Sequence, residues 1–197
     1  MAFKLFGLWD LSEIDVKDLG LKRVINLEPK LIVKSHGRSR EDFGKSKVHI
    51  IERLVNLLQV PGSRGKKHKI MSRWVMGKFT KNTQTVIEAF QIIERQKKEN
   101  PIAVFVRALE NAAPRDGVTA IEYGGARYPQ AVDISPMRRL NLTLRFFVHG
   151  AYDKAFNKKV TIAESLAKEI MLAADGASDS YAMQKKNDSE KQADAAR

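Results

Sequence analysis

The side chains in this sequence that are best suited to chemistry are clustered lysines and arginines. Residues 34–81 contain thirteen of them against three acidic residues, in a chain of 197 residues with a net charge of +12. A cluster of one sign can neutralise the phosphates of a polyanion and release its counterions, and this interpretation is favoured over a merely solubilising surface. The candidate phosphate contacts in this segment are Lys34, Arg38, Arg40, Lys45, Lys47, Arg64, Lys66, Lys67 and Lys69.

A second cationic site follows Ser135-Pro136, which is typical of the start of a helix. Arg138 and Arg139 fall in the first turn of this helix, where the helix dipole disfavours cations. Backbone N–H groups at the same end attract phosphate. The pattern predicts that a polyanion neutralises both arginines, which favours nucleic acid over a small-molecule reaction.

Motifs for catalysis or metal binding are weak. The segment from Ser39 to Ser46 contains Gly44-Lys45-Ser46, but Ser39 replaces the first glycine of a phosphate-binding loop. The chain has no cysteine, which excludes disulfides, thiolate metal sites and a cysteine nucleophile. Its four histidines show no metal-ligand spacing, and its serines form no nucleophile elbow. The sequence predicts no enzyme, no catalytic residue, no metal and no cofactor.

A β-hairpin is predicted at about residues 115–135, with Gly124-Gly125 as its turn. Pro129 restricts the second strand to an edge position. A lone two-stranded ribbon is weakly stable in water, so the hairpin should protrude from helices that brace it. Tyr123 and Tyr128 flank the turn, where they either stack on bases or contact a protein, or else pack against each other across the ribbon.

The remaining segments favour helices, because apolar residues recur with a period near 3.6. Helices are expected from Lys47 to Pro61, from about Thr83, from Asn100-Pro101 to Pro114, and from Ser135-Pro136 to Gly150. A short apolar helix over 70–79, another over 151–157, and one from the capping box Thr161–Glu164 to Gly176 complete the series. The fold class is therefore mainly α: a helical bundle with an inserted extended β-hairpin and a flexible basic N-terminal region.

The predicted organisation has three parts. Residues 1–46 form an N-terminal extension and basic arm, 47–176 a helical RNA-binding domain that contains the hairpin, and 177–197 a polar C-terminal tail. Neither a signal peptide nor an apolar run long enough to span a bilayer is evident, so a cytoplasmic location without membrane contact is expected.

Several ordered motifs together resemble the universal small-subunit ribosomal protein seven family, most closely its archaeal form, over almost the whole chain. They are Ile50-Ile51-Glu52-Arg53-Leu54-Val55-Asn56, Ala89-Phe90-Gln91-Ile92-Ile93, Asn100-Pro101, Pro114-Arg115, Gly124-Gly125-Ala126, Ala131-Val132-Asp133-Ile134-Ser135-Pro136-Met137-Arg138-Arg139 and Thr161-Ile162-Ala163-Glu164. The regions of Trp9-Asp10 and Phe43-Gly44-Lys45 are similar to archaeal rather than bacterial members.

The resemblance implies a structural component of the small ribosomal subunit, located in cytoplasmic ribosomes. It implies binding to the 3′ major domain of small-subunit rRNA, nucleation of head assembly, and a hairpin near the tRNA exit site and the mRNA path. Neighbouring head proteins, mRNA and exit-site tRNA would be further partners. By the same resemblance, Arg53, Arg115, Arg138 and Arg139 join the basic segment in facing RNA. The tip would consist of Tyr123, Gly124, Gly125, Ala126, Arg127 and Tyr128.

Two hypotheses from other classes stay open at this point. One is a nucleotide-hydrolysing enzyme that uses Gly44-Lys45-Ser46. The other is an architectural DNA-binding protein that inserts the hairpin into a minor groove.

Overall fold

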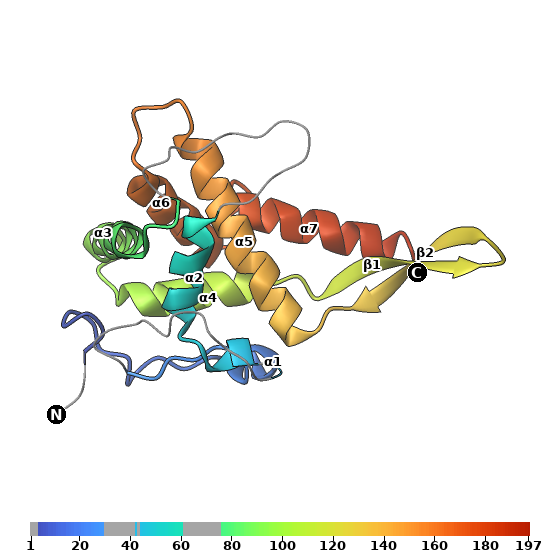
Figure 1. The fold of residues 1–197 in the computed structure, drawn as a ribbon, viewed down its shortest axis with the longest axis horizontal. Coiled ribbons are helices and arrows are strands. Elements are labelled where there is room, and N and C mark those ends of the chain that lie inside the picture. Colours follow the sequence, from blue (N-terminus) through green and yellow to red (C-terminus); the bar gives the residue numbers. More distant parts are fainter. Residues whose placement is uncertain (1–3, 30–41, 43, 61–75) are drawn as a thin grey trace.

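The computed structural model describes residues 4–29, 42, 44–60 and 76–197. Helices form a bundle, and one two-stranded hairpin extends from its end (Figure 1). The elements in chain order are α1 (Leu19–Lys22), the 3-10 helix η1 (Gly44–Lys47), α2 (Ile50–Gln59), α3 (Phe79–Lys97), α4 (Pro101–Ala112), β1 (Asp116–Tyr123), β2 (Ala126–Asp133), α5 (Pro136–Ala155), α6 (Ile162–Ala174) and α7 (Tyr181–Asp194). The mainly helical fold with an inserted hairpin is confirmed.

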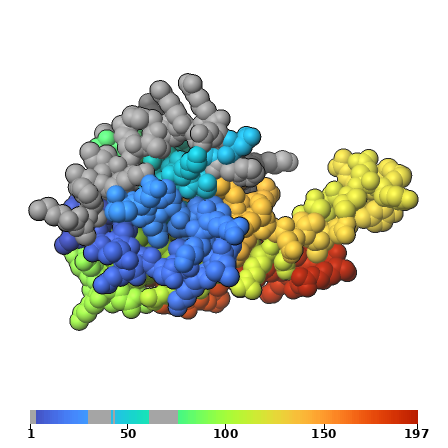
Figure 2. Space-filling view, turned by 90° about the horizontal axis from the view of Figure 1, so that it is seen from below, coloured from blue at the N-terminus to red at the C-terminus, as the bar shows by residue number. Residues whose placement is uncertain are grey.

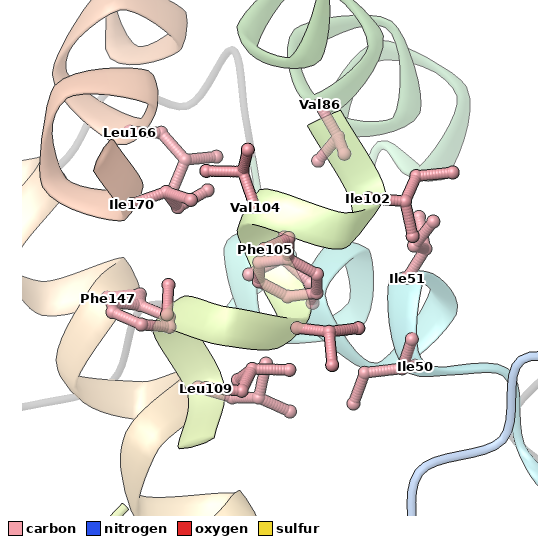
Figure 3. Packing of buried hydrophobic residues seen from close by; sticks show 14 of the residues in the cluster. Ile50, Ile51, Val86, Ile102, Val104, Phe105, Leu109, Phe147, Leu166 and Ile170 are labelled. Atoms are coloured by element: carbon pink, nitrogen blue, oxygen red, sulfur yellow. The ribbon is translucent and has the colours of Figure 1, made fainter. Parts of the chain in front are cut away.

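A line of aromatic rings runs through the core. Trp9 meets Phe90 edge-on at 5.8 Å between ring centroids, Phe90 meets Phe105 at 5.8 Å, and Phe105 meets Phe147 at 6.3 Å. Such spacings are favourable for aromatic pairs. Figure 3 shows Phe105 of α4 between residues of α2, α5 and α6, among them Ile50. The core therefore joins elements that are far apart in the sequence.

Helix starts follow the local sequence signals. Asn100 caps α4 by accepting from the N–H of Ile102, and the predicted capping box of Thr161 and Glu164 is present at the start of α6. In the hairpin, Gly124 and Gly125 have φ values of +59° and +79°, a conformation that favours glycine at both turn positions. These three predictions are confirmed because each depends only on neighbouring residues.

The helix that begins at Pro136 does not stop at Gly150, and the separate helix predicted over 151–157 does not form. Instead α5 continues to Ala155. Gly150 is buried, and a Cβ there would lie 2.9 Å from Tyr181 Cβ and 3.0 Å from Glu169 Cδ. The glycine thus serves close packing of α5 against α6 and α7 rather than termination. The helix expected from Thr83 also begins earlier, at Phe79.

The predicted polar tail over 177–197 contains a helix, α7. Only Ala182 and Ala193 are buried on it, so its apolar periodicity is too weak to find in the sequence. Figure 1 shows α7 running from the bundle toward the hairpin, with the C-terminus beside the strands. Tertiary contacts rather than intrinsic pattern therefore position this helix.

The N-terminal region was predicted to be flexible, but residues 4–29 pack on the bundle. Leu5, Trp9, Leu11, Val16 and Leu21 are among the apolar side chains of this segment that are buried. The helix predicted over 70–79 lies mostly outside the described residues. No helix in the described part of the chain is long and apolar enough to cross a membrane.

Candidate nucleic-acid interface

A hollow of about 730 Å³ lies where η1, α2 and α5 meet. Four of its side chains are cationic: Lys45 from η1, Arg53 from α2, and Arg138 and Arg145 from α5. The acidic side chain in its lining is Asp42. Positive charge in a concave surface raises the local concentration of anions, so this hollow is the best candidate in the described residues for phosphate binding.

The charge pattern predicted Lys45 and Arg138 as contacts to a polyanion, and the family resemblance implied that Arg53 faces RNA; the structure brings these three side chains to one hollow. Lys45 and Arg138 are exposed. Sequence reasoning missed Arg145, which is also exposed and lines the same hollow. Its spacing from Arg138, seven residues or two helical turns, was the signal that could have found it.

Arg53 has an unusual environment for a cation. It is only 7% exposed, and its guanidinium donates to Asn141 Oδ1 at 2.8 Å and to the Val24 carbonyl at 3.3 Å. A third, weaker contact is to the Met137 sulfur at 3.4 Å. Burial lowers the pKa of Arg53 to about 10, so the side chain remains charged at neutral pH. A buried cation with neutral partners gains strongly from a nearby anion.

Arg139, in the first turn of α5, differs from Arg53 in having its own anion. Its Nη2 lies 2.8 Å from Asp18 Oδ2, and its Nε donates to the Pro114 carbonyl at 3.2 Å. Only 8% of Arg139 is exposed. The interpretation that an external polyanion must neutralise this arginine is therefore corrected: Asp18 of the same chain does so. Direct contact between Arg139 and RNA stays a prediction.

The other predicted cations fall into two groups. Lys47 and Arg115 are exposed, and the backbone N–H of Arg115 donates to Glu190 Oε1 at 3.1 Å. The remaining candidates lie outside the described residues: Lys34, Arg38, Arg40, Arg64, Lys66, Lys67 and Lys69. Their contribution to the interface stays a prediction.

The hairpin forms an arm that reaches well beyond the helical body (Figure 2). In its antiparallel register Ile121 faces Tyr128 and Tyr123 faces Ala126. Because directly opposite residues lie on the same face, Tyr123 and Tyr128 are diagonal neighbours. They are 81% and 58% exposed, and Ile121 and Val132 on that face are 45% and 40% exposed. Much of each tyrosine ring therefore remains available to a partner.

The base of the hairpin is braced by the C-terminal segment. Ser189 Oγ donates to the Asp116 carbonyl at 3.1 Å, and Arg197 Nη2 lies 2.9 Å from Asp116 Oδ2. Further out, the N–H of Ala131 donates to the Ala196 carbonyl at 3.4 Å. The prediction that helices brace the hairpin is confirmed. The bracing element is α7 with the last residues, a segment that was predicted to be a polar tail.

The nucleotide-hydrolysis hypothesis finds little support. Gly44–Lys47 forms the 3-10 helix η1, and α2 starts only at Ile50, so the helix N-terminus does not follow the Gly-Lys-Ser sequence directly. Lys45 instead faces the cationic hollow. Among the described residues, no group of three or more His, Asp or Glu side chains is arranged to hold a metal ion.

A helical body with a cationic hollow and a projecting hairpin fits a nucleic-acid-binding protein better than an enzyme. The sequence matches the family described as "Ribosomal protein S7p/S5e" over residues 22–197. It is 48% identical to the small ribosomal subunit protein uS7 of Nanoarchaeum equitans over 198 aligned positions, which cover 100% of both chains. The chain therefore belongs to the ribosomal protein S7p/S5e family.

Two further archaeal relatives have the same name. The protein of Methanosphaera stadtmanae is 42% identical over 198 positions, again covering 100% of both chains. That of Methanothermobacter thermautotrophicus is 43% identical over 189 positions, covering 95% of each. The expected resemblance to the archaeal form is confirmed.

Proposed function

We propose that this chain is a structural, non-enzymatic component of the small ribosomal subunit that binds the 3′ major domain of its rRNA and nucleates assembly of the head. Family membership supports the ribosomal role. The observation that carries RNA binding is Arg53, a buried cation in the wall of a hollow with neutral hydrogen-bond partners. A phosphate in the hollow would supply a negative charge that the hydrogen-bond partners of Arg53 among the described residues do not provide.

The mechanism is electrostatic and architectural. Lys45, Arg138 and Arg145 reach the hollow from two elements, so one folded RNA segment can contact all three only if its phosphates have the matching spacing. Each neutralised phosphate releases a counterion, and folded RNA is recognised largely by backbone and shape. Converging RNA helices held this way would be a nucleus for further assembly.

Binding to a transcript of the 3′ major domain at several salt concentrations tests this proposal. Arg138→Gln and Arg145→Gln should each weaken binding. The slope of log affinity against log salt concentration should become shallower in each variant by the amount that corresponds to about one phosphate contact. Arg107→Gln is the matched control, because Arg107 is exposed, pairs with Glu99 at 2.9 Å and is not part of the hollow. Equal slopes for all three variants would overturn the assignment of the hollow. Charge reversal of Lys66 and Lys67 should have the same effect as loss of hollow cations.

We further propose that the hairpin acts near the tRNA exit site and the mRNA path. The support is its reach beyond the body (Figure 2) and the exposure of Tyr123 and Tyr128 near its tip. Shortening the turn at Gly124-Gly125 should leave rRNA affinity unchanged but impair exit-site tRNA binding in reconstituted subunits. Loss of head assembly in that variant would refute this separation of roles.

Association with the ribosome can be tested directly in native lysate. On a sucrose gradient the tagged chain should stay with small subunits after a high-salt wash. If it remains at the top of the gradient, the ribosomal proposal fails. Competition between duplex DNA and structured RNA would then test the architectural DNA-binding hypothesis.

A further inference from the structure

Residues 4–29, here called the N-terminal strap, are attached to the bundle by specific polar contacts as well as by apolar packing. Trp9 Nε1 donates to Glu94 Oε2 of α3 at 3.0 Å. Glu110 Oε1 of α4 accepts from the backbone N–H of Lys17 at 2.6 Å and of Asp18 at 3.0 Å. The strap therefore has a defined path across α3 and α4, passes beside α5, and reaches the start of α2, where the N–H of Ile50 donates to the Asn26 carbonyl at 3.1 Å.

At that point the strap contacts both buried arginines of the cationic region. Asp18 Oδ2 accepts from Arg139 at 2.8 Å, and the Val24 carbonyl accepts from Arg53 at 3.3 Å. Arg53 lines the hollow, and Arg139 is adjacent to Arg138, which also lines it. One segment thus holds a residue from α2 and a residue from the first turn of α5.

Asp18 is the centre of this junction. Its Oδ1 caps α1 by accepting from the N–H groups of Gly20 and Leu21 at 2.8 and 3.3 Å, which leaves Oδ2 for Arg139. Partial burial alone would raise the pKa of Asp18, but the hydrogen bond and charge of Arg139 and the two N–H groups outweigh it, and the pKa is lowered. A Cβ on Gly20 would be 3.7 Å from Pro136 Cγ, so α1 packs directly on the start of α5.

We infer that Asp18 is a positioning residue for the cationic hollow, fixing the first turn of α5 so that Arg138 faces the same anion as Lys45 and Arg53. This inference rests on the proposed RNA-binding function of the hollow. The change in RNA affinity that it predicts for loss of Asp18 is opposite in sign to the change that net charge alone predicts. Removing an acidic group from a protein normally strengthens its binding to a polyanion, whereas removing Asp18 should weaken it.

The test compares Asp18→Asn with Asp15→Asn, which carries the same charge change in the same strap. Asparagine caps helices about as well as aspartate, so α1 keeps its start. Asp15 pairs with Lys22 at 2.9 Å, and its side chain is 76% exposed. Affinity for the 3′ major-domain transcript should fall about three- to tenfold in Asp18→Asn, with a salt slope shallower by about one phosphate. Asp15→Asn should bind as tightly as the parent chain or more tightly.

Circular dichroism at the assay temperature shows whether each variant is folded, so a loss of stability alone cannot produce the expected result. If Asp18→Asn is unfolded, Asp18→Glu and its control Asp15→Glu replace the pair, since they keep the charge and change only its position. Weaker binding by Asp18→Glu than by Asp15→Glu supports the inference. A folded Asp18 variant that binds as well as its control overturns it. If Arg138→Gln and Arg145→Gln also leave binding unchanged, the proposed RNA-binding function of the hollow itself has failed.

Discussion

The cationic hollow and the hairpin have opposite designs. The wall of the hollow contains one buried arginine, Arg53, and its other cations come from elements that are packed in the core. The hairpin is exposed along most of its length, and its hydrogen bonds to the C-terminal segment lie at its base and as far out as Ala131. Charges that must match the spacing of phosphates need rigid walls, whereas an arm that must reach outward needs only a firm base.

Both regions are nevertheless stabilised by an end of the chain. The N-terminal strap holds Arg53 at the hollow and Arg139 next to it, and α7 with the last residues holds the hairpin. The start of α7 is itself fixed by Glu169, a fully buried residue of α6. Glu169 accepts from Ser180 Oγ at 2.7 Å, from the N–H of Ala182 at 3.0 Å and from Lys154 Nζ at 2.6 Å. A carboxylate in the middle of the bundle thus anchors the start of the helix whose other end contacts the hairpin.

The largest effect is expected from Glu169→Ala. It leaves a cation and two donors without their shared acceptor, which should lower the free energy of unfolding by about 3 kcal/mol. Urea denaturation measures this, with the exposed Glu88→Ala as control, which should change stability by less than about 0.5 kcal/mol. Equal stability of the two variants would mean that α7 is not held by Glu169.

The two buried arginines should respond differently to the same substitution. Arg139→Gln breaks the ion pair with Asp18 and should lower the free energy of unfolding by about 1–3 kcal/mol. Arg53→Gln removes a buried charge with neutral partners, so its cost should be smaller, while RNA affinity should fall. Thermal melting and transcript binding measured together separate the effects. The predicted difference between the two arginines is wrong if Arg53→Gln lowers the free energy of unfolding more than Arg139→Gln does.

Acid should weaken the junction between strap and hollow. The pKa of Asp18 is lowered from its ordinary 3.8, so its contribution is fully present above that value and is lost as the pH falls through the lower folded value. Asp18→Asn should therefore lose less stability than the parent chain when the pH drops below about 4. Asp10 and Asp15 also have lowered pKa values, from hydrogen bonds with Ser12 and Lys22 respectively. Their loss of stabilisation in acid is the same in the parent chain and in Asp18→Asn. Parallel curves of stability against pH would contradict the prediction.

The smallest change in stability is expected at the tip of the arm. Tyr123→Ser removes a ring that is 81% exposed, so the free energy of unfolding should change by less than about 0.5 kcal/mol. If the ring stacks on a base or a neighbouring protein, binding at the exit site should still weaken. A destabilisation well above that limit would instead favour packing of Tyr123 against Tyr128.

Local signals in the sequence were sufficient for the features that depend on adjacent residues. Gly124-Gly125 determined the hairpin turn, Asn100-Pro101 the start of α4, and Thr161 with Glu164 the start of α6. Ordered motifs determined the family, and the clustering of charge determined that a polyanion is the expected partner. The turn and the helix starts follow from backbone geometry within a few residues, whereas the family and the polyanion follow from the order of motifs and the distribution of charge along the chain.

Only the tertiary structure decided the rest. Glycine is typical of a helix end, yet Gly150 lies inside α5. A side chain at this position would collide with Tyr181 of α7 and Glu169 of α6. Arg138 and Arg139 are neighbours in the sequence, but one faces the hollow and the other faces Asp18, which is 121 residues away along the chain. The physical reason is that a side chain's burial and its counter-ion depend on the packing of distant segments, which residue type and local spacing do not specify.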